Sequence, residues 1–323
     1  AATSGGLTHN VNGNIVGFDP MLGPLADNGG PTLTHLPSVL SPVIDAGTDV
    51  GLDEDQRGFD RDFDGDGDGS SVTDIGAVEV GPFRVNTTAD TVDANPGDGF
   101  AQDASGNTSL RAAVMEANAL GGLRTIQVPA GEYVLTIPGV GEDNAATGDL
   151  DIHVDILIEG DGKDQTIINA NGIDRVFDVA APLLPPSPAP PPPPAVLELR
   201  GLTVTGGNVN DPTAGGGGVR VVDGDLTVVD SVISGNQVNN TSSGAQGGGG
   251  IFGQFAFVDV YDSTIEGNST NANGGGIRVE GGSMFVSNSS ITGNTAGRGG
   301  GIAGSNYANA SSYDTDISGT EGK

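Results

Sequence analysis

A short acidic segment carries the clearest chemistry in this sequence. From residue 60 to residue 69 it reads Asp-Arg-Asp-Phe-Asp-Gly-Asp-Gly-Asp-Gly, so a carboxylate stands at every second position. Glycines separate the later aspartates, where the backbone has to turn sharply. Closely spaced carboxylates repel one another unless a cation neutralises them, and Ca²⁺ takes roughly six to eight oxygen ligands. The segment therefore predicts a calcium site.

The predicted metal ligands are all aspartates: Asp60, Asp62, Asp64, Asp66, Asp68 and Asp74. The pattern Asp-x-Asp-x-Asp-Gly resembles the first half of an EF-hand loop, but the closing Glu of that loop is missing. The twelfth position counted from Asp62 is Thr73, so Asp74 or Glu79 has to supply the last ligand from outside the loop. The alternative is an acidic loop that is only solvated.

Four glycine runs, each followed at once by Ile or Val, divide the last third of the chain. They end at Gly218, Gly250, Gly276 and Gly301, which gives spacings of 32, 26 and 25 residues. Behind the first three runs, apolar residues align without a gap at positions +1, +8, +10 and +15: Val219, Ile251, Ile277; Leu226, Val258, Met284; Val228, Val260, Val286; Ile233, Ile265, Ile291. A period of this size predicts a repeat architecture.

The apolar positions alternate with polar ones, as in Asp225-Leu226-Thr227-Val228. This period of two is typical of a strand with one buried face, and no repeat shows helical periodicity. One repeat cannot bury its apolar face alone, whereas stacked coils can. We therefore predict a parallel β-helix. Flexible linkers are the alternative for the glycine runs, but linkers do not hold apolar residues in register.

Two polar columns follow from the same alignment. Position +13 is Ser231, Ser263 and Ser289, and position +18 is Asn236, Asn268 and Asn294. Stacked amides can hydrogen-bond along such a column. The simpler alternative is a turn, because the Gly-Asn pair tolerates left-handed backbone angles. Both interpretations are structural.

Weaker signals extend the coils upstream. Residues 198–207 keep the apolar spacing of a coil, and residues 150–159 and 125–137 have the composition of further strands. Between them lies a proline-rich segment, 182–194. Because proline lacks the amide donor of a sheet ladder, we expect this segment to leave the coil as an exposed polyproline II loop.

Composition and charge narrow the classes of function. The formal net charge is −30, so nucleic acid and anionic membrane surfaces are not expected as partners. No apolar run is long enough to span a membrane, and no membrane insertion is predicted. The chain has no Cys. Only 4% of its residues are aromatic, and this low aromatic content suits the narrow interior of a solenoid. Because it begins at Ala1 without Met or a signal peptide, we expect a segment of a longer secreted precursor.

Residues 108–119 read Thr-Ser-Leu-Arg-Ala-Ala-Val-Met-Glu-Ala-Asn-Ala and resemble the CSLREAI-type motif of bacterial surface β-helix proteins. Thr108 stands in place of the motif's Cys, and Ala112 in place of its Glu. The resemblance implies a short amphipathic helix, 109–119, that plugs the N-terminal mouth of the solenoid. The residues agree independently, since the apolar ones share a helical face: Leu110, Ala113, Val114 and Ala117. Ser109 or Thr108 is available as the N-cap.

Four segments nearer the N-terminus, 19–36, 41–47, 55–58 and 74–79, are together similar to the choice-of-anchor Q module. In that family the module normally follows the β-helix, as its C-terminal end. Here it comes first. Residues 5–17 also resemble the last coil of a β-helix whose body is absent.

The predicted fold class is all-β: a right-handed parallel β-helix with a short N-terminal capping helix and a small preceding β-rich module that carries the calcium loop. The predicted domains are the anchor-like module, 1–80, the cap, 81–124, and the coils, 125–323. The handedness comes from the family resemblance. The domain boundaries follow the changes of motif along the chain.

The order of these modules suggests a function. The last coil, 301–323, has Asn309 and Ser311 where apolar residues belong, so it lacks a recognisable cap. We therefore expect residues 1–80 of one copy to complete the last coil of the copy before it. Copies would be joined in a covalent tandem array or head to tail without covalent bonds, and either arrangement propagates. The predicted protein is a self-assembling structural unit of a bacterial extracellular or cell-surface filament.

Two other classes of function stay open. The first is a calcium-dependent adhesin or glycan-binding β-helix, with a cell-surface glycan as partner. The second is a polysaccharide lyase or hydrolase that uses surface carboxylates: Asp223, Asp225, Asp230, Asp259 and Asp262. The acidic surface is unsuited to a lyase acting on acidic polymers, and the three histidines are scattered along the chain. No catalytic residue is predicted.

Overall fold

The computed structural model describes residues 3–9, 11, 14–26, 28, 30–48, 51–65, 70–180, 194–211, 214–239, 246–305, 309–319 and 321–322. The chain forms two compact units. The first contains residues 1–82 with 95–100, and the second contains residues 83–94 with 101–323. Most of the predicted proline-rich segment, 182–193, lies outside the described residues, as do Asp66 and Asp68.

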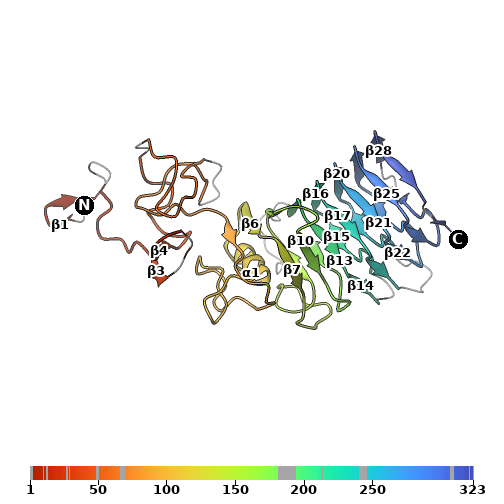
Figure 1. Ribbon diagram of the computed structural model, residues 1–323, viewed down its shortest axis with the longest axis horizontal. Coiled ribbons are helices and arrows are strands. Elements are labelled where there is room, and N and C mark those ends of the chain that lie inside the picture. The colour runs from red at the N-terminus through yellow and green to blue at the C-terminus, as the bar shows by residue number, and fades with distance from the viewer. Residues whose placement is uncertain are drawn as a thin grey trace, which may run out of the picture. The chain divides into compact units, whose positions relative to one another are not determined.

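The second unit is a parallel β-solenoid of about six turns, as predicted (Figure 1). Each coil contributes one strand to each of three long sheets, and the later coils add a short fourth strand. The eight-stranded sheet contains β5 (Phe83–Arg84), β6 (Arg124–Val128), β9 (Ile156–Gly160), β12 (Val196–Arg200), β16 (Asp225–Val229), β20 (Phe257–Tyr261), β24 (Ser283–Ser287) and β28 (Asn309–Tyr313).

The other sheets of the solenoid are built in the same way. The seven-stranded sheet contains β7 (Gly131–Val134), β10 (Thr166–Asn169), β13 (Thr203–Thr205), β17 (Val232–Ser234), β21 (Thr264–Glu266), β25 (Ser290–Thr292) and β29 (Asp316–Ser318). The six-stranded sheet contains β8 (Leu150–Ile152), β11 (Phe177–Ala180), β15 (Val219–Val222), β19 (Ile251–Gln254), β23 (Ile277–Glu280) and β27 (Ile302–Ser305). The five-stranded sheet contains β14 (Asn208–Val209), β18 (Gln237–Val238), β22 (Ser269–Thr270), β26 (Thr295–Ala296) and β30 (Glu321–Gly322).

The predicted apolar register is confirmed. Leu226 pairs with Val258 and Val258 with Met284 on adjacent strands, and each is at most 3% exposed. Positions +1, +10 and +15 stack in the same way and are buried. They form one continuous hydrophobic core with the inward residues of the earlier coils.

The glycine runs are part of the ladder and do not behave as linkers. The amide of Gly218 donates to the carbonyl of Gly250 at 2.9 Å, and the amide of Gly250 donates to Gly276 at 3.1 Å. A Cβ added at Gly250 would lie 2.7 Å from the carbonyl oxygen of Gly276. Glycine is required here because successive backbones approach too closely for any side chain.

The two polar columns are buried hydrogen-bonded ladders. Asn236 Nδ2 donates to Asn268 Oδ1 at 3.0 Å, and Asn268 Nδ2 donates to Asn294 Oδ1 at 3.1 Å. Each serine hydroxyl accepts the backbone N–H of the serine one coil earlier, from Ser231 to Ser263 and from Ser263 to Ser289. The ladder interpretation of the asparagine column is therefore correct, and the columns satisfy buried backbone groups at the corners of the coils.

Helix α1 (Leu110–Leu120) begins the solenoid. Ser109 is its N-cap, and its hydroxyl accepts the N–H of Ala112 at 3.0 Å. The predicted apolar face of α1 is buried in the core, and the helix packs against β6 and β8, which belong to the first coil. No helix in the described part of the chain is long and apolar enough to cross a membrane.

The first unit has little regular structure among its described residues. Its strands are β1 (Thr3–Ser4), β2 (Leu7–Thr8), β3 (Leu22–Ala26) and β4 (Thr34–Pro37). They form two antiparallel pairs, β1 with β2 and β3 with β4. Side chains rather than strands satisfy much of the remaining backbone.

Candidate functional site

The predicted calcium ligands lie in different environments. Asp60 and Asp62 are exposed, Asp64 is half-buried and Asp74 is only 2% exposed. Within the described residues, one group of three acidic side chains brings its oxygens within 4.8 Å of one another, and it lies in the solenoid. The four described ligands are therefore not gathered into a single ligand set. The calcium site stays a prediction, since the segment 66–69 is not described.

Asp74 accepts two backbone hydrogen bonds in the first unit. Its Oδ1 accepts the N–H of Asp45 at 2.8 Å, and its Oδ2 accepts the N–H of Val80 at 2.6 Å. Asp45 in turn accepts the amides of Gly65 and Val72, each at 3.1 Å. Asp45 thus binds the backbone on both sides of the segment that contains Asp66 and Asp68, and Asp74 binds the backbone of Asp45.

Glu79 completes this network. Its Oε2 accepts the N–H of Asp74 at 2.9 Å, while Oε1 is buried with no hydrogen-bond partner in the described structure. Burial raises the pKa of Glu79 to about 7 and that of Asp74 to about 6. Repulsion from Asp74 and Asp45 adds to the shift of Glu79, and repulsion from Asp45 adds to the shift of Asp74. Hydrogen bonds from backbone amides and the charge of Arg61 oppose the shifts without cancelling them.

In the described part of this unit, Asp55, unlike Asp74 and Glu79, forms an ion pair with an arginine, Arg57. Its Oδ1 accepts the N–H of Arg57 at 2.7 Å, and its Oδ2 lies 2.8 Å from the Arg57 guanidinium. The N–H of Glu79 also donates to Oδ2, at 3.0 Å. Burial alone would raise the pKa of Asp55, but these hydrogen bonds outweigh it and the pKa is lowered.

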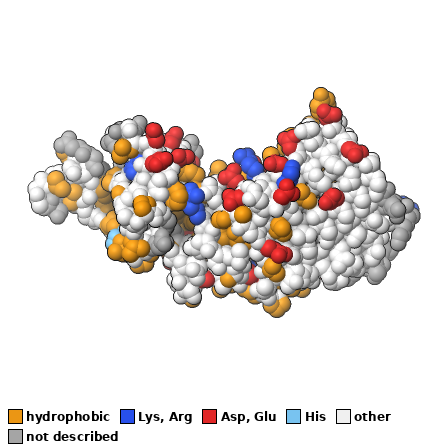
Figure 2. Space-filling view, viewed as in Figure 1, with side chains coloured by type: hydrophobic (Ala, Val, Ile, Leu, Met, Phe, Trp, Pro, Cys, Tyr) orange, Lys and Arg blue, Asp and Glu red, His pale blue; other side chains and the backbone are white. Residues whose placement is uncertain are grey.

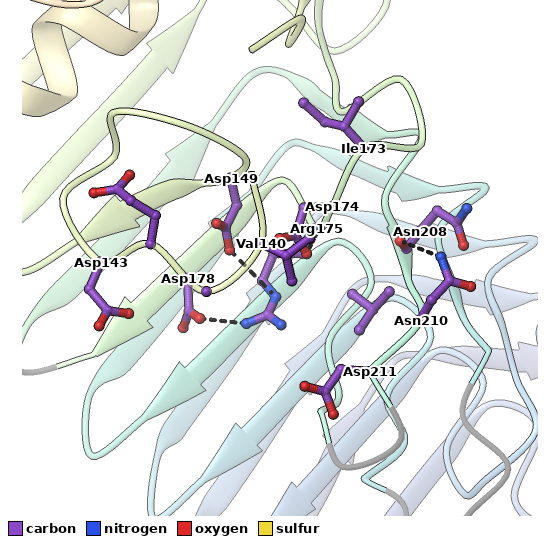
Figure 3. Close-up of a pocket in the computed structure, with 13 residues that line it drawn as sticks. Val140, Asp143, Asp149, Ile173, Asp174, Arg175, Asp178, Asn208, Asn210 and Asp211 are labelled. Carbon is purple, nitrogen blue, oxygen red and sulfur yellow. Dashed lines mark hydrogen bonds and ion pairs between the residues drawn. The ribbon is translucent and has the colours of Figure 1, made fainter. Parts of the chain in front are cut away.

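The second candidate site is a pocket of about 340 Å³ on the solenoid (Figure 3). Its lining comes from the segments around β8, β11 and β14. The charged residues that line it are Glu142, Asp143, Asp149, Asp174, Arg175, Asp178 and Asp211. Val140, Ile173 and Val209 supply apolar surface, and Asn208 and Asn210 supply amides.

An ion-pair cluster forms the inner wall of this pocket. Arg175 lies between Asp149 and Asp178, at 3.6 Å from Asp149 and in hydrogen-bond contact with Asp178 (Figure 3). Arg220, on the next strand, donates to both carboxylate oxygens of Asp178 at 2.8 and 2.9 Å. Asp151 lies beside Asp178 in register and accepts the N–H of Ala145 at 2.7 Å.

Negative charge is in excess in this cluster, and the pKa values reflect it. Burial raises the pKa of Asp149 well above its usual value, although Arg175 opposes the shift. Burial, with repulsion from Asp178, raises the pKa of Asp151 to about 7. Burial also raises the pKa of Asp174. The acidic neighbours of Arg175 raise the pKa of its guanidinium, although burial acts to lower it.

The arrangement has two chemical possibilities. The oxygens of Asp149, Asp151 and Asp178 lie within 4.8 Å of one another, close enough to share a proton or hold a cation. Arg175 and Arg220, however, already place positive charge against this group, and Asp151 does not line the pocket. The described geometry is that of a partly compensated charge cluster joining three adjacent strands.

The sequence analysis missed this cluster, although a signal existed. Three successive strands of the six-stranded sheet, β8, β11 and β15, each carry one charged residue between two apolar ones. The segments are Leu-Asp-Ile at 150–152, Phe-Asp-Val at 177–179 and Val-Arg-Val at 219–221. The central residues Asp151, Asp178 and Arg220 stack in register. The proline-rich segment lengthens the coil between Asp178 and Arg220 to 42 residues, so the glycine-run alignment, which begins at Val219, does not extend back to Asp151 and Asp178.

The surface carboxylates considered for catalysis fall into two structural groups. Asp223, Asp230 and Asp262 occupy corners where the backbone has positive φ angles of 51°, 44° and 52°. Such corners favour Asp, Asn and Gly, which explains these residues without chemistry. Asp225 and Asp259 lie on β16 and β20 of the eight-stranded sheet and are half-buried.

The fold places this chain among the parallel β-solenoid proteins. Comparison with protein-family models, with curated proteins and with solved structures finds no match. The CSLREAI-type motif and the anchor-like module therefore remain resemblances of short segments.

Proposed function

We propose that this protein is a structural, self-assembling unit of a bacterial extracellular or cell-surface filament. In this proposal, residues 1–80 of one copy complete the last coil, 301–323, of the preceding copy. Calcium bound at the acidic segment 60–74 would rigidify the junction between copies. The resemblance of residues 108–119 to a motif of bacterial surface β-helix proteins supports the cell-surface setting.

One observation carries the proposal. The strands β27, β28, β29 and β30 each stand at the edge of their sheet and pair on one side only within the described structure. Ala310 and Ser312 continue the inward columns of Met284 and Val286, yet both are exposed. Ile317, which continues the column of Ile291, is 46% exposed. This face offers main-chain groups and apolar surface to a further coil, from the same chain or from another copy.

Assembly is tested with two lysine substitutions on β28. Ala310→Lys places a charge on the inward column at the coil edge, whereas Ser311→Lys places the same charge on the outward face of the same strand. We expect the wild type and Ser311→Lys to form rods in electron micrographs and in light scattering. We expect Ala310→Lys to stay dispersed. Dispersed wild-type protein, or rods that persist in Ala310→Lys, would contradict the proposal.

The partner segment is tested by cross-linking. Because the chain has no Cys, Ser311→Cys provides a single attachment point for a photo-reactive label. We expect mass spectrometry to find the label attached to residues 1–80 of another copy. Attachment to the solenoid alone would exclude the proposed head-to-tail contact.

The calcium proposal is tested by titrating the full chain with calcium chloride in a calorimeter. We expect binding heat that disappears in Asp62→Asn/Asp64→Asn and persists in the matched control Asp53→Asn, which changes an exposed carboxylate nearby. Heat that is unchanged in the double variant would place calcium elsewhere.

A further inference from the structure

The outer face of the eight-stranded sheet carries an unusual concentration of aromatic side chains over its last coils. The chain has ten Phe and four Tyr, and five of these lie on or beside β20, β24 and β28: Phe255, Phe257, Tyr261, Phe285 and Tyr313. We call these five the aromatic platform. Phe255, Phe257 and Tyr313 are 62%, 61% and 70% exposed. These exposed rings are not part of the core, whose inward positions on β20 and β24 are filled by Val258, Val260, Met284 and Val286.

The strand register brings the rings together. Phe285 pairs with Asp259 on the neighbouring strand, and Tyr261 lies two residues further along that strand. The ring centroids of Tyr261 and Phe285 are 5.8 Å apart, with an angle of 50° between the planes. Tyr313 follows Ser287 in the same row as Tyr261. Successive coils are separated by roughly 4.8 Å, so the rings sample a surface a few coils long.

Phe255 is a backbone outlier. It occupies a corner with a φ of 52°, a conformation that bulky residues rarely adopt. The corresponding corners of the neighbouring coils carry Asp223 and Gly281, with φ values of 51° and 67°. The ring of Phe255 is mostly exposed, so burial within the chain does not offset the strain. Strain of this kind, without compensation in the fold, is found at binding sites.

Carboxylates accompany the rings on the same face. Asp259 lies in the row of Phe285, and Asp225 lies in the row of Phe257. Asp259 Oδ2 accepts the Tyr261 hydroxyl at 3.4 Å, and Asp225 Oδ1 accepts the N–H of Phe257 at 3.4 Å, both at the long limit of hydrogen bonding. No ion pair of the described structure involves either carboxylate. Burial and mutual repulsion raise the pKa of Asp259.

These features select a ligand by its chemistry. Aromatic faces attract both the C–H faces of sugar rings and ammonium groups. Half-buried carboxylates without a basic partner favour a ligand that brings positive charge and hydroxyl donors. The formal net charge of −30 disfavours anionic polymers, and Figure 2 shows acidic side chains spread over the visible face of the solenoid. A pyranose carrying an amino group combines all of these properties.

We infer that the aromatic platform, with Asp225 and Asp259, is a binding site for amino-sugar oligosaccharides, such as glucosamine oligomers. The rings stack against the sugar faces, and the two carboxylates accept ammonium and hydroxyl donors. The site lies on the lateral face of successive coils of one chain, so the inference does not depend on filament assembly.

The inference is tested by calorimetry with the full chain and glucosamine tetramers at moderate ionic strength. Three comparison ligands are used: cellotetraose, tetragalacturonate and tetralysine. We expect glucosamine tetramers to bind most tightly and tetragalacturonate not to bind. Tetralysine bound as tightly as the glucosamine tetramer would show that charge alone is recognised and would overturn the inference. Preference for cellotetraose, or the absence of glucosamine binding, would also overturn it.

Variants locate the site. Phe257→Ala and Asp259→Asn should each weaken glucosamine binding on the order of fivefold, and the double variant should abolish it. The matched controls are Phe18→Ala, an equally exposed ring at 60% exposure in the first unit, and Asp164→Asn, an exposed carboxylate in the turn before β10. Both controls should bind as the wild type does. Equal losses in the controls and the platform variants would place binding elsewhere.

Folding of the variants is checked separately. Phe257 and Asp259 point outward from β20 and are not part of the core, so thermal unfolding of both variants should match the wild type. Rods of the wild-type protein together with absent glucosamine binding would refute this inference alone. Glucosamine binding by wild-type protein that stays dispersed would refute the filament proposal alone.

Discussion

The two units of this chain satisfy their buried backbone groups in opposite ways. In the solenoid, each strand hydrogen-bonds to the same strand of the next coil, and Asn and Ser fill the corners. In the first unit, the carboxylates Asp45, Asp55, Asp74 and Glu79 accept backbone amides from distant loops. The first solution depends on repetition, because each coil presents the same donors and acceptors. The second depends on charge, so we expect it to respond to pH and to single carboxylate changes.

The largest expected effect tests this dependence on charge. Asp55→Ala removes the acceptor for three backbone amides and leaves the buried Arg57 guanidinium without its carboxylate. Breaking a buried ion pair costs about 3–5 kcal/mol. We expect the first unit to unfold while the solenoid keeps its structure, as measured by hydrogen exchange of peptides from each unit. Asp53→Ala, an exposed neighbour, should leave both unchanged. Loss of protection in the solenoid would show that the units do not behave independently.

Asn268→Ala tests how much the buried asparagine column stabilises the solenoid. The change removes the acceptor for the N–H and the amide of Asn236 and the donor to the carbonyl of Ile233. Each buried group left unpaired costs about 1–3 kcal/mol, so we expect a loss of about 3 kcal/mol or more in urea unfolding. Asn271→Ala, at an exposed position of the same coil, is the control. An equal loss of unfolding free energy in the control would show that the asparagine column does not stabilise the solenoid.

The pH dependence should separate the units further. A carboxyl whose pKa is raised in the folded state binds its proton more tightly there than in the unfolded chain, so stability falls as pH rises through the window between the two values. For Glu79 this window runs from 4.5 to about 7, and for Asp74 from 3.8 to about 6. We expect the first unit to be more stable at pH 5 than at pH 8, on the order of 2 kcal/mol.

Glu79→Gln should remove most of this dependence above pH 6, because only the smaller shift of Asp74 remains. Asp55 does not interfere, since its lowered pKa acts below pH 3.8. Hydrogen exchange of residues 72–80 across the pH range measures the effect, with Glu54→Gln as an exposed control. A slope that is the same in Glu79→Gln and the wild type would assign the pH response to other groups.

The smallest expected effect has the opposite sign. Phe255→Asn replaces a bulky residue at positive φ by one that tolerates this conformation, and should stabilise the solenoid by about 1 kcal/mol. Phe257→Asn is the matched control, because Phe257 is equally exposed but does not share the positive φ of Phe255. Thermal unfolding of both variants provides the comparison. A gain in the control, or none in Phe255→Asn, would remove the argument for strain at the platform.

Much of the solenoid could be predicted from the sequence, because a repeated backbone forces equivalent residues into equivalent environments. Val219, Ile251 and Ile277 share one position of the sequence alignment, and all three are buried in one column of the core. A separate signal, the helical spacing of apolar residues after Thr108 and Ser109, predicted the helix that Ser109 caps. The aromatic platform follows from this register as well, since Phe257 and Phe285 lie at outward positions that the alignment defines.

The candidate sites were less accessible to sequence reasoning. Asp74 is a predicted metal ligand, and in the structure its two oxygens accept the amides of Asp45 and Val80. A spacing pattern cannot distinguish these roles, because both require a carboxylate near a turn. Asp151 and Asp178 meet because they occupy the same register position on β8 and β11. The lengthened coil between Asp178 and Arg220 interrupts the period, so the alignment that starts at Val219 does not reveal this column.

The buried asparagine column has a consequence for how such coils can be joined. In both described steps the side-chain nitrogen of one coil donates to the side-chain oxygen of the coil that follows, so the amide dipoles point the same way and reinforce one another. A coil added in the same orientation lengthens this row of dipoles, whereas a reversed coil would set like poles together. Any assembly that continues the stack therefore inherits an electrical polarity and two chemically different ends.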